Sequence, residues 1–526
     1  MKRLIACLLV LISVVSFGQK QHYADFYEGS KKRSEGFYER GLEHGQWTWW
    51  FENGEVKETS IYYFGQLDGP TLTYYDNGQL KQEGYFIKGV QDSIMRSFSR
   101  DSVLLEEGKY RNGRKVSEWN YWFENGDVML QEIYLDSLKE VFYFRDEEKE
   151  QLVDGTGIYF ERYPNGTKKF ETTYQNGRKN GSHIAWYSDG TVKEEGTFEA
   201  HRRAGVWKEY FRDGSIEREA QFTNGELNGT FKQYFRDGIT DVEGTYADGK
   251  KNGDWTWYFR DGQVDMQGPF EADLQQGAWT YYYGNGNVHY AGNYQKGEMD
   301  GVWNYFYFTS EKWKTGSYSA GLKQGTWNYW FENGNDLMTG TFVDDLENGE
   351  WTSWYENGNT KDVGNYTRGK LDGNWKGWYP NGVNNYEGAW KNDFRVGIWS
   401  FWWENGKPHE VAEYDNEGVR NGKWESYNQA GILEQKGNYK AGMPDGKWSY
   451  YFPNGSIQRM HNYKLGRMDG LSVTYDRRGR KLQETEYKMN RKHGKFVTYN
   501  DRTGEIEQHL IFENGKMVKT VKGLME

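Results

Sequence analysis

The chain has 526 residues and a formal net charge of −11; 36% of its residues are hydrophobic and 18% are aromatic. This composition is too polar for a thick aliphatic core and too aromatic for a disordered chain. The net negative charge disfavours a nucleic-acid partner, because phosphate contacts need clustered lysine and arginine.

The first 18 residues have the layout of a secretory signal peptide. Two basic residues precede an apolar run from Leu4 to Val15, and we expect cleavage after Gly18. The run is shorter than the roughly 20 residues that span a bilayer, so we expect no transmembrane segment after cleavage. Cys7 is the only cysteine, and a lipid anchor on it is disfavoured because most of the apolar run follows it. We therefore expect a periplasmic, cell-surface or secreted protein whose mature form has no disulfide.

Residues 19–126 form an N-terminal set of repeats with a spacing that becomes regular later. Gly45 and Gly69 are 24 residues apart, and each leads into an aromatic run that ends in Asn-Gly. Between residues 127 and 156 the register fails, since the step from Ser117 to Gly157 is 40 residues, one period plus 16. We favour a degenerate repeat that has lost eight residues, because loops absorb deletions. A kink or boundary between two sub-arrays is the alternative.

Regular 24-residue repeats occupy residues 157–421, and glycine recurs at that spacing from Gly157 to Gly397 without a slip. A constant period of this length identifies a tandem array. Counting from the glycine as position 0, position 2 is aromatic in ten of eleven repeats, position 5 in ten and position 17 in all eleven. Positions 8 and 9 read Asn-Gly or Asp-Gly in ten repeats. Residues 422–526 continue the array with fewer rings at the end, which is typical of a cap.

Each repeat is predicted to be a β-hairpin. Aromatic and β-branched residues at positions 1–6 and 10–17 favour strands on both sides of the Asn-Gly pair. Pro164, Pro380 and Pro453 directly precede that pair. Proline suits the first central position of a type I turn that ends in a left-handed glycine, so we expect three-residue loops at positions 7–9. A second connection, Gly-x-x-x-Gly from position 20 to 24, joins one hairpin to the next.

Strand alternation assigns the rings to two faces of the sheet. We expect positions 5, 11 and 17 on one face and positions 2, 4 and 6 on the other. Short turns at both ends make successive strands antiparallel neighbours. The predicted fold class is therefore all-β, an elongated single-layer antiparallel meander of ~20 tandem β-hairpin repeats, on the order of 190 Å long before twisting.

The run Gly-x-Tyr-x-x-Gly-x-x-x-Gly-x-Trp-x-x-Tyr-Tyr-x-Asn-Gly resembles the MORN repeat, in the variant form found in bacterial YwqK-type antitoxins, over nearly all of the mature chain. The resemblance implies an elongated array of β-hairpins that serves in protein–protein contact and scaffolding, with lipid binding also proposed for the family. The signal segment, the large copy number and the 24-residue period differ from the common form of the family.

No combination of residues in the sequence indicates catalysis. The nine histidines are scattered without metal-ligand spacing, and the Asp-Gly pairs lack the remaining ligands of a calcium loop. No repeat brings together a base, a nucleophile and an anion hole. We therefore predict a protein that is not an enzyme, with no catalytic residue, no cofactor and no metal site.

Aromatic residues on both faces indicate an interaction surface, because one buried face suffices to stabilise a one-layer sheet. The surplus face then suits a partner. We predict an exported scaffold that binds protein partners or copies of itself. Its binding specificity would lie either in the face taken over all repeats together or at residues 127–156. A cell-wall or carbohydrate-binding array is one alternative, since the hairpins also resemble choline-binding repeats; an antitoxin or immunity protein that occludes a toxin is another. The candidate partner-binding residues are Trp255, Trp257, Phe259, Trp279, Tyr281, Trp303, Tyr305, Trp327 and Tyr329.

Overall fold

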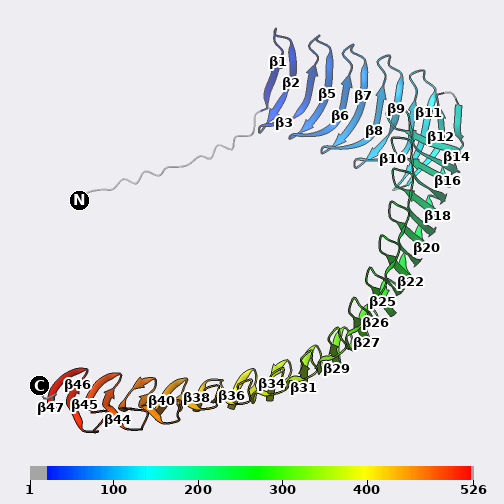
Figure 1. Ribbon diagram of the computed structural model, residues 1–526. Helices are drawn as coiled ribbons and strands as arrows, with labels where there is room; N and C mark the ends of the chain where they lie inside the picture. Colours follow the sequence, from blue (N-terminus) through cyan, green and yellow to red (C-terminus); the bar gives the residue numbers. More distant parts are fainter. Residues whose placement is uncertain (1–19, 137, 148, 523–526) are drawn as a thin grey trace, which may run out of the picture. The chain divides into compact units, whose positions relative to one another are not determined.

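The computed structural model describes residues 20–136, 138–147 and 149–522. These residues form 47 β-strands and no helix (Figure 1). The chain divides into two compact units, residues 1–250 and residues 251–526. The predicted signal peptide, residues 1–18, lies outside the described residues.

The N-terminal unit is a meander in which successive strands pair antiparallel, as β18 and β19 do. Its strands are β1 (Gln21–Phe26), β2 (Lys32–Glu39), β3 (Leu42–Glu43), β4 (Gly45–Trp50), β5 (Val56–Tyr63), β6 (Gln66–Tyr74), β7 (Leu80–Ile87), β8 (Val90–Phe98), β9 (Leu104–Arg111), β10 (Arg114–Trp122), β11 (Val128–Leu135), β12 (Leu138–Asp146), β13 (Lys149–Val153), β14 (Thr156–Arg162), β15 (Lys168–Gln175), β16 (Arg178–Trp186), β17 (Val192–Glu199), β18 (Arg202–Tyr210), β19 (Ile216–Thr223), β20 (Glu226–Tyr234) and β21 (Thr240–Ala247).

The C-terminal unit continues the same pattern, with β24, β33 and β42 as short first segments of strands that resume after a break. Its strands are β22 (Lys250–Tyr258), β23 (Val264–Glu271), β24 (Leu274–Gln275), β25 (Gly277–Tyr282), β26 (Val288–Gln295), β27 (Glu298–Phe306), β28 (Lys312–Ser319), β29 (Leu322–Trp330), β30 (Asp336–Val343), β31 (Leu346–Trp354), β32 (Thr360–Thr367), β33 (Lys370–Leu371), β34 (Gly373–Trp378), β35 (Asn384–Lys391), β36 (Phe394–Trp402), β37 (Pro408–Tyr414), β38 (Arg420–Tyr427), β39 (Leu433–Lys440), β40 (Met443–Tyr451), β41 (Ile457–Lys464), β42 (Arg467–Met468), β43 (Gly470–Tyr475), β44 (Lys481–Lys488), β45 (Arg491–Tyr499), β46 (Ile506–Glu513) and β47 (Lys516–Lys522). The predicted all-β meander of hairpin repeats is thus confirmed.

The three-residue loop predicted at positions 7–9 is present. The amide of Tyr163 donates to the carbonyl of Thr167 over 2.8 Å, and the amide of Gly166 donates back to Tyr163 over 2.9 Å. Gly166 has a φ of +86°, the left-handed conformation that glycine adopts without steric cost. Pro164 stands at the first loop position, where no ladder hydrogen bond is needed.

Side chains of this loop edge also bond to the next repeat. The hydroxyl of Tyr163 at position 6 donates to the carbonyl of Trp186 over 2.9 Å. The side-chain amide of Asn165 at position 8 donates to the carbonyl of Ser188 over 2.8 Å. These two successive loops are therefore linked by side chains as well as by the strand ladder.

The second connection is shorter than predicted. Asn224 and Gly225, at positions 19 and 20, have φ values of +54° and +91° and form a two-residue turn between the paired residues Thr223 and Glu226. Positive φ at both residues is the mark of a type I′ turn, whose twist matches that of the strands. The glycine at position 24, Gly229, belongs to the following strand β20 and not to the turn.

The predicted placement of position 17 is wrong, because a β-bulge follows each three-residue loop. Tyr258 pairs with Val264 and Trp257 pairs with Met266, which leaves Asp265 as an extra residue on β23. An extra residue moves every later side chain to the opposite face. Phe270 at position 17 accordingly packs against Trp255, with ring centroids 6.2 Å apart, on the face of positions 2 and 4.

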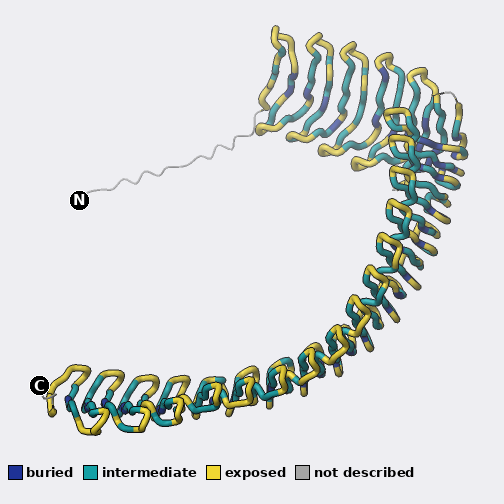
Figure 2. Tube along the Cα trace, in the orientation of Figure 1, coloured by how far each residue is buried: buried dark blue, intermediate teal, exposed yellow. Residues whose placement is uncertain are grey.

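The two faces of the sheet therefore differ in chemistry. We call the side of positions 2, 4, 13, 17 and 22 the aromatic face and the side of positions 3, 5 and 14 the polar face. On the polar face, the hydroxyl of Tyr210 donates to Glu195 over 2.6 Å, and Lys208 lies 3.3 Å from Glu219. Buried residues lie within the strands and exposed residues concentrate at the turns (Figure 2).

Tryptophans at position 2 form the core of the aromatic face. Trp303 is fully buried, and its indole lies over Gly292 of the preceding hairpin, where no side chain intervenes. Its Nε1–H donates to the carbonyl of Asn293 over 3.1 Å. The same hydrogen bond recurs along the chain: the indole Nε1–H of a position-2 tryptophan donates to the carbonyl of the residue after position 15 of the preceding hairpin. The tryptophans that make it are Trp47, Trp119, Trp207, Trp279, Trp303, Trp327, Trp375, Trp399 and Trp448.

The segment 127–156 ends with β13 and the first residue of β14, and these two strands form a hairpin that is shorter than its neighbours. Beyond its tip, β12 approaches the turn between β15 and β16: the amide of Val141 donates to the carbonyl of Gly177 over 2.9 Å. Val141 and Leu152 are fully buried there, in a cluster with Leu130, Tyr159 and Tyr174. Whether this hairpin is a degenerate repeat or a functional boundary stays a prediction.

Candidate functional site

The candidate residues predicted from the sequence lie in the C-terminal unit, mostly in one continuous chain of ring contacts. Trp255 contacts Trp257 at 5.7 Å between centroids, and Trp257 contacts Trp279 at 5.9 Å. The chain of contacts continues through Tyr281, Tyr290, Trp303, Tyr305, Trp327 and Tyr329. Phe259 lies instead at the start of a three-residue loop, where its carbonyl accepts from Gly262.

Burial divides this set into two groups. Trp255, Trp279, Trp303 and Trp327 are each at most 1% exposed, so their indoles belong to the core and not to a free surface. The reason is that a one-layer sheet has no second layer, and its rings must cover one another. The rings at position 4 are only half-buried, and they supply the accessible part of the face: Trp257, Tyr281, Tyr305 and Tyr329. Their role in partner binding stays a prediction.

Tyrosine hydroxyls on the aromatic face bond to each other. The hydroxyls of Tyr281 and Tyr294 are 3.3 Å apart, and those of Tyr305 and Tyr318 are 3.2 Å apart. Burial is the main cause that raises the pKa of Tyr305, and its bond to Tyr318 adds to the rise. The phenol of Tyr305 therefore stays neutral at physiological pH.

A lysine or arginine at position 22 lies over the position-2 ring of the next repeat in several hairpins. Lys323 Nζ is 5.1 Å from the Trp327 ring centroid, and Arg395 Cζ is 4.7 Å from that of Trp399. In each case the cation precedes the ring by four residues in the chain. The other pairs are Lys115 with Trp119, Arg203 with Trp207, Lys251 with Trp255 and Lys492 with Phe496.

The row of large side chains at positions 4 and 13 is interrupted in the C-terminal unit. Register places Met338, Ser353, Asp362, Gly377 and Tyr386 side by side on successive strands. Ser353 and Gly377 occupy position 4, where Tyr305 and Tyr329 of earlier repeats carry rings. Ser353 leaves a hollow in the aromatic face, whereas the ring of Tyr386 lies over Gly377 and fills the space there.

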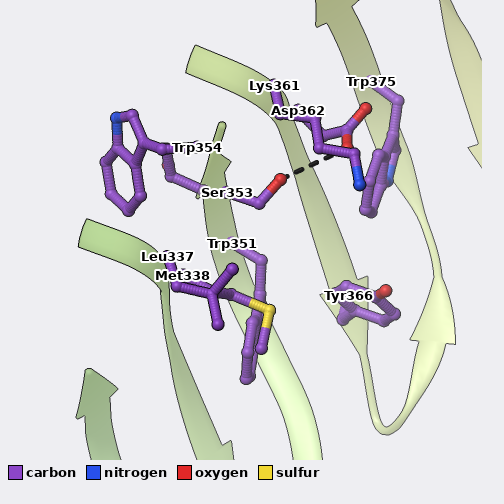
Figure 3. Close-up of a pocket in the computed structure, with 10 residues that line it drawn as sticks. Leu337, Met338, Trp351, Ser353, Trp354, Lys361, Asp362, Tyr366 and Trp375 are labelled. Carbon is purple, nitrogen blue, oxygen red and sulfur yellow. Dashed lines mark hydrogen bonds between the residues drawn. The ribbon is translucent and has the colours of Figure 1, made fainter. Parts of the chain in front are cut away.

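The hollow has a volume of about 340 Å³ and is lined by tryptophan, tyrosine, methionine and a carboxylate (Figure 3). Trp351 and Trp375 contribute indoles, and the hydroxyl of Ser353 donates to Asp362 over 3.2 Å. The hydroxyl of Tyr386 also donates to Asp362. A carboxylate offers about four acceptor sites, so Asp362 retains capacity for a further donor.

Three carboxylates act on the wall of the hollow, which Lys361 also lines. Burial, and then the charges of Glu347, Asp362 and Asp393, raise the pKa of Tyr366 in its wall. Glu347 stands at position 22, where other repeats carry a cation, and Leu371 stands at that position before Trp375. The hollow was not predicted from the sequence, although Ser353, directly after a run of rings at position 4 from Trp257 to Tyr329, is a visible signal.

In the described part of the chain, no group of three or more histidine, cysteine, aspartate or glutamate residues is placed to hold a metal ion. No helix long and apolar enough to cross a membrane occurs among residues 20–136, 138–147 and 149–522. The absence of a cofactor stays a prediction.

Comparison with known protein families identifies the repeat. Ten segments match the model of the MORN repeat variant, at residues 43–63, 67–88, 156–176, 203–224, 251–272, 275–296, 347–367, 395–416, 420–441 and 444–465. These ten segments carry the MORN repeat variant. Most matched MORN segments begin at position 22 of one repeat, where Lys251 and Arg395 stand, and end in the next type I′ turn. Most matched segments are therefore one hairpin together with the position-22 residue that precedes it.

Comparisons with whole proteins add little to the MORN assignment. A search of curated proteins found no match. Among solved structures, the chain is similar to "Crystal Structure of TcdB2-TccC3-Cdc42", at 9% identity and a TM-score of 0.12, over 95% of this chain and 33% of that one. It is also similar to "Structure of Photorhabdus luminescens Tc holotoxin pore, Mutation TccC3-D651A", at 10% identity and a TM-score of 0.13, over 94% and 33%. The chain thus spans about a third of each, and these TM-scores are too low to indicate a shared fold.

Proposed function

We propose that the chain is an exported, non-enzymatic scaffold that binds protein partners or copies of itself along its aromatic face. The observation that carries the proposal is the row of half-buried rings from Trp257 to Tyr329, which lies outside a core that the position-2 tryptophans already supply. MORN repeats generally serve as interaction scaffolds, and solenoid arrays usually bind rather than catalyse. Aromatic side chains are enriched where proteins bind each other.

Export is proposed from the N-terminal sequence. A basic start, an apolar run and small residues near Gly18 are the pattern of a cleaved signal. The mature protein would act in the periplasm, at the cell surface or outside the cell. Sequencing the N-terminus of the protein from fractionated cells tests this, and an intact Met1 on protein from the cytoplasm would overturn it.

Site-specific photo-crosslinking tests the scaffold function. Tyr281 lies on the aromatic face and its neighbour Tyr282 points to the polar face, where Gln267 donates to its hydroxyl over 3.0 Å. A photoreactive phenylalanine at 281 should capture protein partners in native cells, and the same residue at 282 should capture far less. Equal capture from both positions, or none from 281, would overturn the use of the aromatic face.

The crosslinking experiment also separates the alternatives. Products of twice the chain's mass would assign the face to self-association, which the proposal includes. Retention on cell-wall glycan that is lost in Trp257→Ala would replace the scaffold with the carbohydrate-binding alternative. Capture of a toxin whose activity the chain suppresses would support a YwqK-type antitoxin role.

A further inference from the structure

The array itself shows how its aromatic face accommodates positive charge. In six hairpins a lysine or arginine at position 22 lies over the ring at position 2 of the next repeat, with 3.7 Å between Lys115 Nζ and the Trp119 centroid as the shortest distance. Such cations are attracted by the electron-rich faces of the rings. Arg395 also contacts Trp390 and Phe401, so one guanidinium covers three rings.

The hollow at Ser353 has the rings of this arrangement without the cation. Trp351 is preceded by Glu347, and Trp375 by Leu371, at the positions where Lys323 and Arg395 stand in neighbouring repeats. The ring expected at position 4 is replaced by Ser353, which opens space beside the indoles. A carboxylate, Asp362, lies in that space.

Size and charge both define an occupant. A volume of about 340 Å³ is at the small end of the range of ligand pockets, roughly 300 to 1,000 Å³. A planar group that stacks on an indole and donates to a carboxylate is a guanidinium, since arginine combines flat apolar faces with a fork of N–H donors. Asp362 keeps acceptor capacity beyond its bonds from Ser353 and Tyr386.

We propose that the hollow lined by Trp351, Asp362 and Trp375 binds the guanidinium group of an arginine side chain presented by a protein partner. The source of the arginine rests on the proposed scaffold function, whereas the binding of a guanidinium does not. The partner's arginine takes the place that the array's own position-22 cation takes in other repeats.

The lysine that lines the hollow, Lys361, does not occupy it. Its ammonium lies 5.9 Å from the Tyr355 centroid at the loop edge and leaves the carboxylate of Asp362 to other donors. Glu43 likewise precedes Trp47 at position 22, but the hollow there is also lined by Arg33 and Lys57 and so holds its own cations. At the hollow beside Ser353, both the position-22 cation and the position-4 ring are missing, and a carboxylate is present.

The test uses N-acetyl-arginine amide as the probe and N-acetyl-citrulline amide as its neutral isostere, with ligand-observed NMR on the full chain. We expect the arginine probe to bind and the citrulline probe to bind at least about tenfold more weakly, the loss typical of a charge-assisted bond. Asp362→Asn should weaken the arginine probe by a similar factor. Equal binding of the two probes, or binding unchanged by Asp362→Asn, would overturn the proposal.

Two variants restore what other repeats carry and therefore keep the fold. Glu347→Lys installs the array's own cation, and Ser353→Tyr installs the missing ring; each should abolish probe binding by filling the hollow. Glu350→Lys is the matched control, because it makes the same change of charge at an exposed residue of the polar face. It should bind the probe nearly as well as the natural chain, and a loss as large as that in Glu347→Lys would overturn the site assignment.

The outcomes separate this inference from the proposed function. Probe binding that depends on Asp362, together with no protein captured from position 281, would leave the site standing and remove the scaffold. Partner capture that is unaffected by Glu347→Lys and Ser353→Tyr, with no probe binding, would do the reverse. Tighter binding of N-acetyl-lysine amide than of the arginine probe would overturn the choice of guanidinium.

Discussion

The indole of Trp303 lies directly over Gly292, where a Cβ atom would stand 2.2 Å from the ring carbon Cδ2. Glycine at position 15 thus leaves the space into which the tryptophan of the next hairpin packs. Gly292→Ala should destabilise the array by about 1 to 3 kcal/mol, the usual cost of overpacking. Hydrogen exchange over β26 and β27 would register the loss.

Gly284→Ala is the control for that prediction. Gly284 lies in a three-residue loop, has no left-handed φ, and a Cβ there would meet nothing within 4 Å. It should leave exchange in β26 and β27 unchanged. Equal effects of the two substitutions would show that the contact with Trp303 is not what requires glycine at position 292.

Lys323 contributes to stability through the rings that it covers. Its Nζ lies 5.1 Å from the Trp327 centroid and 4.6 Å from that of Phe342. Lys323→Met keeps the apolar stem and removes the charge, and should cost about 0.5 to 2 kcal/mol. Lys323→Arg should cost much less. Denaturation of both variants at low and high salt is the measurement, and identical midpoints for Met and Arg would contradict the cation–π interpretation.

Alkaline pH should unfold the aromatic face. Burial raises the pKa of Tyr329 to about 12, whereas the unfolded phenol titrates near about 10. Because the folded pKa is the higher one, the folded state holds its proton more tightly; the stabilisation is full below pH ~10 and is lost as the pH rises towards 12. Absorbance of phenolate and far-ultraviolet circular dichroism should therefore change together. Phenols that titrate near pH ~10 while the dichroism stays constant would contradict this.

The ion pair between Arg178 and Glu140 should stabilise the short hairpin region. The guanidinium Nε donates to Glu140 over 2.8 Å, and the glutamate side chain is only 9% exposed. Arg178→Met would leave that carboxylate without its charged partner and should cost about 1 to 3 kcal/mol. The double variant with Glu140→Gln should recover part of the loss. Thermal unfolding compares them, and an unchanged midpoint in Arg178→Met would show that solvent already satisfies Glu140.

Local geometry could be predicted from the sequence where a single residue type demands it. Pro164 before Asn-Gly required a three-residue loop, and the structure has that loop. Position 17 could not be placed correctly, because the bulge at Asp265 has no residue signature of its own and reverses every side chain after it. The burial of Trp303 depends in turn on Gly292 in another hairpin.

The hollow could be recognised only once the pairing register of the strands was known. Ser353, Asp362 and Gly377 are far apart in the repeat, and only the pairing of successive strands makes them neighbours. When the repeats are compared one position at a time, the small residue at position 4 and the carboxylate at position 13 appear as separate features. Only the strand pairing of the sheet brings them to the same hollow.

The bonds from Tyr163 and Asn165 to the next repeat have a mechanical consequence. Several hairpins are fastened to the next one both by the strand ladder and by a side-chain hydrogen bond at the loop edge, and the hydroxyls of Tyr187, Tyr283 and Tyr307 make the same bond as that of Tyr163. Under tension from the two ends of the chain, hairpins should detach one after another, each releasing about 80 Å of contour as its 24 residues extend. A force–extension curve of this chain should therefore show steps of equal length, except where the shorter strands β13 and β14 detach.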